Sequence, residues 1–61
     1  MAQITEKELT ALGDLLSLES MIAAKCCDLA ANTQDMALKD RYGQMAQQHR
    51  NHYERLYANL K

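Results

Sequence analysis

The chain has 61 residues, with seven Lys and Arg against eight Asp and Glu, and no proline, tryptophan or phenylalanine. Because a net charge of -1 gives no basic surplus to neutralise phosphates, we expect no nucleic-acid binding. Charged residues interrupt the apolar stretches of the first 20 residues, so we predict neither a signal peptide nor a membrane span. We expect a single small cytoplasmic domain over residues 1–61.

The first predicted helix covers about residues 5–31. Thr5 and Glu8 have the spacing of a capping box, in which each side chain binds a backbone N–H of the other residue. Asn32 is predicted to end this helix in a left-handed conformation, and Asp35 to cap the next one. Intervals of three and four residues, typical of a helix bundle, relate the apolar positions Leu9, Leu12, Leu16, Ala23, Cys26 and Ala30.

The second predicted helix covers about residues 36–60. The same intervals relate its inward positions Leu38, Tyr42, Met45, His49, His52 and Leu56. A connection this short makes the helices antiparallel, so the predicted fold is an all-α helical hairpin. Two helices cannot enclose a core, and we therefore expect a homodimer that completes a four-helix bundle around a two-fold axis.

Charge supports this packing weakly. Residues 1–34 hold two lysines against five acidic residues, whereas residues 35–61 hold five basic residues against three acidic ones. Opposite signs favour placing unlike helices side by side, although exposed charges contribute little each.

Glu19, His49 and His52 interrupt the apolar pattern. Glu19 lies 14 residues before Thr33 at the centre of the turn, and the two histidines lie 16 and 19 residues after it. In an antiparallel hairpin the three side chains therefore reach one level of the core. A buried carboxylate needs a partner, and this donor set suits one divalent ion of Zn, Fe or Mn. The alternative is a metal-free Glu–His cluster that only fixes the register of the helices.

Neighbouring residues bear on the same site. Ala23 and Ala46 are small and leave room for an ion, and Tyr53 is placed to orient an imidazole through its hydroxyl. The adjacent Cys26 and Cys27 cannot close a useful disulfide loop, and free thiols fit a reducing compartment. We interpret both cysteines as small packing residues, with a second soft-metal or redox site across the dimer as the alternative.

Several short motifs resemble the spore coat protein F family of spore-forming bacteria. They are Thr5-x-Lys7-Glu8, Leu16-x-Leu18-Glu19, Asn32-Thr33-Gln34-Asp35, Leu38-Lys39 and His49-x-x-His52-Tyr53. The resemblance covers nearly the whole chain and implies a half-length, ferritin-like helical bundle associated with sporulation. It further implies a structural or interaction role, with other coat proteins as partners and the spore coat as a location.

Ferritin-like bundles hold metal with a Glu on one helix and a Glu-x-x-His motif on another. Glu19 and His52 match that pattern, but His49 stands where the motif has glutamate. A neutral imidazole cannot bridge two ions, so the pattern favours a single ion per chain, or one ion shared at the two-fold axis of the dimer, over a di-iron centre. A metal-dependent redox enzyme using the same three residues is the alternative function, and a plain adaptor bundle is a third.

Overall fold

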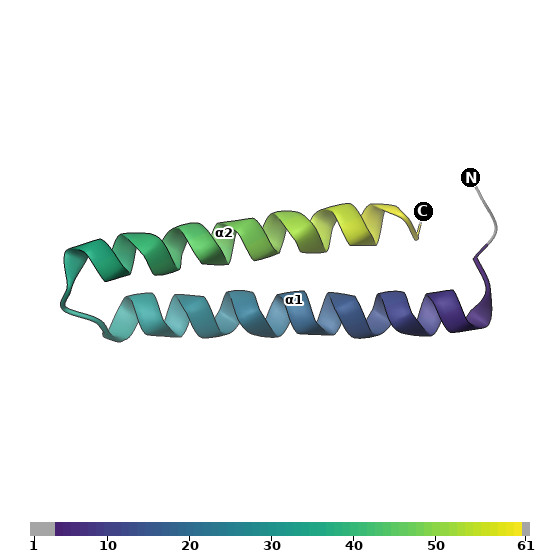
Figure 1. The fold of residues 1–61 in the computed structure, drawn as a ribbon, viewed down its shortest axis with the longest axis horizontal. Coiled ribbons are helices and arrows are strands. Elements are labelled where there is room, and N and C mark those ends of the chain that lie inside the picture. The colour runs from purple at the N-terminus through teal and green to yellow at the C-terminus, as the bar shows by residue number, and fades with distance from the viewer. Residues whose placement is uncertain (1–3, 61) are drawn as a thin grey trace.

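The computed structural model describes residues 4–60, which form two long antiparallel helices (Figure 1). Helix α1 spans Glu6–Asn32, helix α2 spans Met36–Ala58, and residues 4–60 contain no strand. The chain measures 47 × 16 × 11 Å. The predicted all-helical hairpin is therefore present. Neither helix within these residues has the length and apolar composition that a membrane crossing requires.

The beginning of α1 is fixed by the predicted capping box. The Thr5 Oγ1 atom accepts a hydrogen bond from the Glu8 backbone N–H at 3.1 Å, and Glu8 Oε1 accepts one from the Thr5 backbone N–H at 3.3 Å. Both bonds satisfy N–H groups that have no partner inside the first turn of a helix.

The connection between the helices differs in one respect from the prediction. Asn32 is not left-handed: it is the last residue of α1, and no non-glycine residue in the described chain has a positive φ. Its side-chain Nδ2 donates to the Asp28 carbonyl at 2.7 Å, and the chain then leaves through Thr33 in an extended conformation. Asp35 caps α2 as predicted, because its Oδ1 accepts from the Ala37 and Leu38 N–H groups.

Helix α2 ends at Ala58, before the residue 60 suggested by periodicity. The N–H of Asn59 donates to the carbonyls of Leu56 and Tyr57, and Leu60 N–H donates to Tyr57 at 3.0 Å, which tightens the chain into a turn. The final turn also receives a side-chain bond, from Asn59 Nδ2 to the Arg55 carbonyl at 3.0 Å.

The contact between the helices buries only small side chains. Ala23, Cys26 and Ala46 are the buried residues of the described chain, and no large side chain within it is fully buried. Three predicted inward positions, Leu9, Leu38 and Met45, are instead exposed by 51%, 44% and 43%. Two helices touch along one line, so residues on the flanks of each apolar stripe have nothing to cover them.

Candidate metal site

The two helices bring Glu19, His49 and His52 together near the middle of the hairpin. Glu19 is the central residue of α1, with 13 helical residues on each side. The two histidines are three residues apart on α2, a spacing that places them on neighbouring turns of one helix face. One potential ligand atom from each of the three residues lies within 4.8 Å of the other two. The convergence inferred from their distances to the turn is therefore present.

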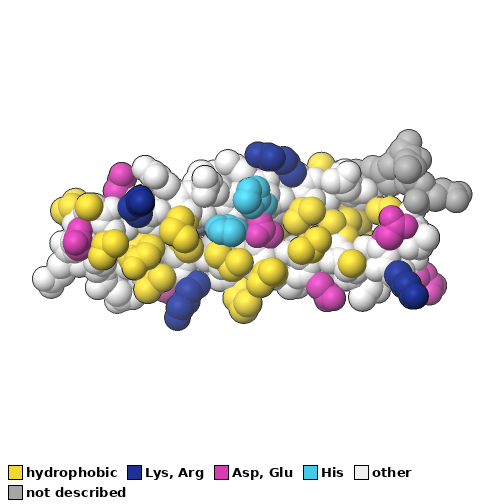
Figure 2. All heavy atoms as spheres, in the orientation of Figure 1, with side chains coloured by type: hydrophobic (Ala, Val, Ile, Leu, Met, Phe, Trp, Pro, Cys, Tyr) yellow, Lys and Arg dark blue, Asp and Glu magenta, His cyan; other side chains and the backbone are white. Residues whose placement is uncertain are grey.

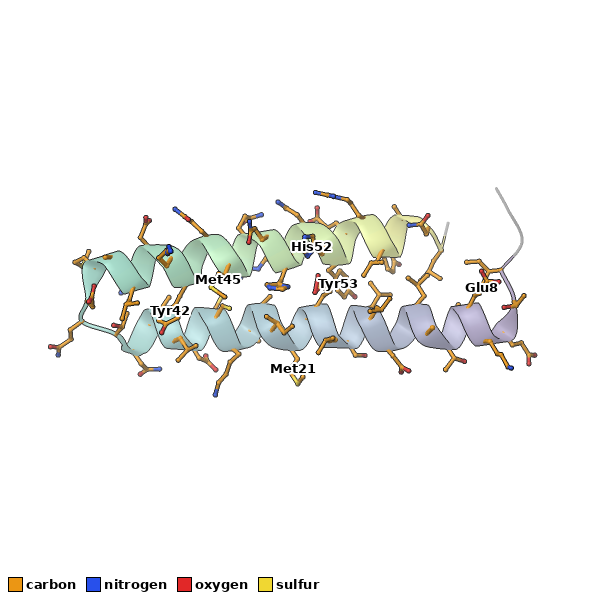
Figure 3. All side chains as sticks on the ribbon, viewed as in Figure 1. Glu8, Met21, Tyr42, Met45, His52 and Tyr53 are labelled. Carbon is orange, nitrogen blue, oxygen red and sulfur yellow. The ribbon has the colours of Figure 1, made fainter. Side chains whose placement is uncertain are left out.

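The Glu19 carboxylate binds one imidazole with each of its oxygens. Oε1 lies 2.9 Å from His49 Nδ1, and Oε2 lies 2.8 Å from His52 Nδ1. The two imidazole rings meet edge to face, with centroids 5.5 Å apart and planes at 83°. Figure 3 labels His52 on α2.

The hydrogen bond from His49 holds the pKa of Glu19 below its ordinary value; partial burial opposes this effect, and the bond from His52 adds to it. The carboxylate is therefore ionised at neutral pH and accepts hydrogen bonds at both oxygens. Each histidine must then carry its proton on Nδ1 and donate it to Glu19. The side chain of Glu19 is 13% exposed and that of His49 is 23% exposed, whereas that of His52 is 49% exposed.

The same atoms form a suitable donor set for a transition-metal ion. Zinc bound tetrahedrally at about 2.0 Å from nitrogen and oxygen keeps its ligand atoms about 3.3 Å apart, so the Glu19–His49 and Glu19–His52 pairs need to open by less than 1 Å. Two imidazoles and one carboxylate also match the three-ligand arrangement that binds Fe(II) with open positions. Metal binding at Nδ1 would require each imidazole to carry its proton on Nε2 instead. Because metal ions compete with protons for the ligand atoms, the affinity would fall at acid pH.

Two hollows border the cluster. One is lined by Leu15, Glu19, His52, Arg55 and Leu56. The other is lined by Glu19, Ser20, Ala23, Ala24, Arg50, Tyr53 and Glu54. Ala23 and Ala46, which were expected to leave room beside the cluster, are both buried between the helices.

Tyr53 does not take the expected role. No hydrogen bond joins it to either imidazole within residues 4–60; its ring stacks parallel to that of Tyr57, with centroids 6.2 Å apart and planes at 7°. The Nδ1 atoms of both imidazoles bind Glu19 instead.

The cysteines lie on the same helix and in different environments. Cys26 is buried with 4% exposure, in agreement with a packing role, and both thiols are free. Cys27 is half-buried, and its Sγ accepts a hydrogen bond from Arg50 Nη2 at 3.2 Å. No spacing signal in the sequence pointed to this contact. The 23-residue separation becomes a contact only once the two helices are aligned.

No protein-family model, curated protein or solved structure matches the chain. The fold and the cluster therefore define the class by themselves: an α-helical hairpin with two histidines and one carboxylate converging at mid-length.

Proposed function

We propose that this protein is a small structural or interaction protein whose two helices are held together at mid-length by one divalent metal ion. The observation that carries the proposal is the contact of Glu19 with both His49 and His52, across the two helices and within hydrogen-bond distance. A metal ion at this position would link α1 to α2. Such a link would add stability to a hairpin whose residues 4–60 bury only three small side chains.

The resemblance to the spore coat protein F family gives the proposal its biological setting. We extend it to a component of the bacterial spore, made in the cytoplasm and assembled with other coat proteins. The short motifs quoted above support this setting. Immunodetection in purified spore coats and in the cytosol of the same cells tests it, and a signal confined to vegetative cytosol would contradict it.

A metal-dependent redox function is the second candidate. Three protein ligands leave at least one coordination position of a transition metal open, and the 49% exposure of His52 gives small molecules access to that position. With bound Fe(II), consumption of oxygen or peroxide that disappears on loss of either histidine would favour this function over the structural one.

Metal titration of the purified, untagged protein tests the proposal directly. Zinc or cobalt should bind at one ion per chain by calorimetry, and cobalt should give the visible absorption of a low-symmetry site. Zinc at 100 times its dissociation constant should stabilise the fold by about 2.7 kcal/mol. For a domain of this size, each kcal/mol raises the melting temperature by about 4–8 °C.

Three variants and two controls make the result specific. His49→Ala, His52→Ala and Glu19→Gln should each weaken zinc binding by about 100-fold or more, since each removes a ligand. Two control variants should leave the zinc affinity unchanged. Glu54→Gln is the equivalent change at a glutamate that lines the hollow beside Ala23, and Asn51→Ala changes an exposed neighbour of His52. Absence of binding to the wild-type chain would overturn the proposal and leave the cluster as a device for helix register.

A further inference from the structure

One side of the hairpin carries an apolar face beside the cluster. Figure 2 shows this side, with hydrophobic side chains to the left and right of the two histidines. Leu15 of α1 and His52 of α2 line the same hollow, which places the apolar stripes of the two helices on one side of the molecule. Five residues of this face are 38–46% exposed and the sixth is half-buried. The face comprises Leu15, Leu18, Ile22, Leu29, Leu38 and Met45.

The area that the chain leaves exposed matches what a dimer buries. The surface of this 6.9 kDa chain is 4948 Å². A compact monomer of that mass exposes about 4,000 Å². The excess of about 900 Å² is close to the roughly 800 Å² that each partner buries in a stable complex. The excess exists because no large side chain in the described residues is fully buried.

The position of the cluster along the hairpin favours a second copy as the occupant. Glu19 is the central residue of α1. Any two-fold pairing that overlaps two such helices along their whole length therefore brings the clusters of both copies to one level. The acidic excess of residues 1–34 and the basic excess of residues 35–61 also make the surface complementary to itself.

We propose that a second copy of this chain covers the apolar face and closes the open side of the metal site, an inference that rests on the proposed metal-binding function. His52 is the ligand at this boundary, because it is the most exposed of the three and borders the hollow shared with Leu15. The side of each cluster that is open in a single hairpin then faces the cluster of the other copy. Metal binding and dimerisation become linked equilibria, and each strengthens the other.

Sedimentation equilibrium of the full chain, after EDTA treatment and again with one equivalent of zinc, tests the linkage. We expect a dimer whose dissociation constant falls about tenfold or more with zinc. Leu18→Glu should dissociate the dimer, whether or not the resulting monomer keeps its helical circular dichroism signal. Leu9→Glu is the matched control, since nine residues at about 100° each place Leu9 on the opposite side of α1 from Leu18.

A second measurement does not depend on how the variants fold. Wild-type protein loaded with Cu²⁺ should show the dipolar broadening of two nearby ions in its electron paramagnetic resonance spectrum, since the two clusters face each other. Isolated copper signals in a wild-type dimer would overturn the inference, as would a dissociation constant that zinc leaves unchanged.

The remaining outcomes separate this inference from the proposed function. A folded wild-type monomer that binds zinc overturns the dimer and leaves the metal-binding function standing. Equal dissociation by Leu9→Glu and Leu18→Glu overturns the assignment of the face. A chain that binds no zinc in calorimetry overturns the metal-binding function, and the linkage with it.

Discussion

Glu19 and His49 are 30 positions apart in the chain, and their Oε1 and Nδ1 atoms lie 2.9 Å apart between the two helices. Arg50 and Cys27 form one hydrogen-bonded cross-link between α1 and α2, and the Glu19–His49 contact, with the matching one to His52, forms another. It joins the two helices half-way along their length. The stability of the hairpin should therefore depend on the charge state of Glu19.

Replacing Glu19 with Gln should destabilise the metal-free protein at neutral pH and have little effect at acid pH. The folded-state pKa of Glu19 lies below its ordinary value of 4.5. A lowered pKa stabilises the fold above the unfolded-state value, and this contribution is lost as the pH falls through the folded-state value. Melting curves recorded in EDTA from neutral to acid pH measure this contribution to stability. Glu54→Gln should show no such pH dependence, and a constant difference for Glu19→Gln would refute the assignment.

Ala46→Leu should destabilise the hairpin by about 1–3 kcal/mol, because a larger side chain at a closely packed position forces the backbones apart. Ala46 is 3% exposed and lies three residues before His49 on α2. The same change should weaken zinc binding, since it separates His49 from Glu19. Ala37→Leu, at an exposed position of the same helix, is the control for thermal melts and zinc titrations. Equal melting temperatures for the two variants would show that the helix contact tolerates a larger residue.

Asp35→Ala should cost about 1 kcal/mol through loss of the cap of α2. The Oδ1 atom of Asp35 accepts hydrogen bonds from Ala37 N–H at 2.9 Å and Leu38 N–H at 3.1 Å, and both donors would lose this partner. The measurement is urea unfolding followed by circular dichroism. Asp40→Ala, an exposed position within α2, should change the free energy of unfolding by less than about 0.5 kcal/mol. Similar losses for both variants would point to a general effect of charge.

The two thiols should differ in reactivity. Cys26 is 4% exposed, whereas Cys27 is half-buried at the edge of the helix contact. Iodoacetamide followed by mass spectrometry should therefore show Cys27 modified at least about tenfold faster in the native protein, because access controls the rate of a buried thiol. Denaturant should remove the difference. Preferential modification of Cys26 would mean that the helices pack in another register.

Much of the local structure follows from short sequence signals. The capping box of Thr5 and Glu8 and the Asp35 cap depend on atoms within three residues of one another, so their spacing alone predicts them. The predicted left-handed conformation of Asn32 was wrong, and the reason is also local. Its amide found a partner in the Asp28 carbonyl, which stabilises an ordinary helical conformation at that residue.

The convergence of Glu19, His49 and His52 was also predictable, because an antiparallel hairpin with a short turn relates levels on its two helices by counting. The direction of each side chain was not predictable in this way. A count of levels does not say that each Glu19 oxygen would bind one imidazole or that Tyr53 would instead stack on Tyr57. Those outcomes depend on the rotation of each helix about its own axis.

Short signals along the chain suffice to predict two helices, the N-terminal caps of both and the three polar residues that share one level. These properties depend on backbone hydrogen bonding and on distances along one chain. The packing of the two helices fixes which apolar residues are covered, brings Arg50 to Cys27, and leaves His52 half exposed beside an apolar face. A side chain is buried only by contact with a second surface, so its burial depends on how the two helices pack against each other.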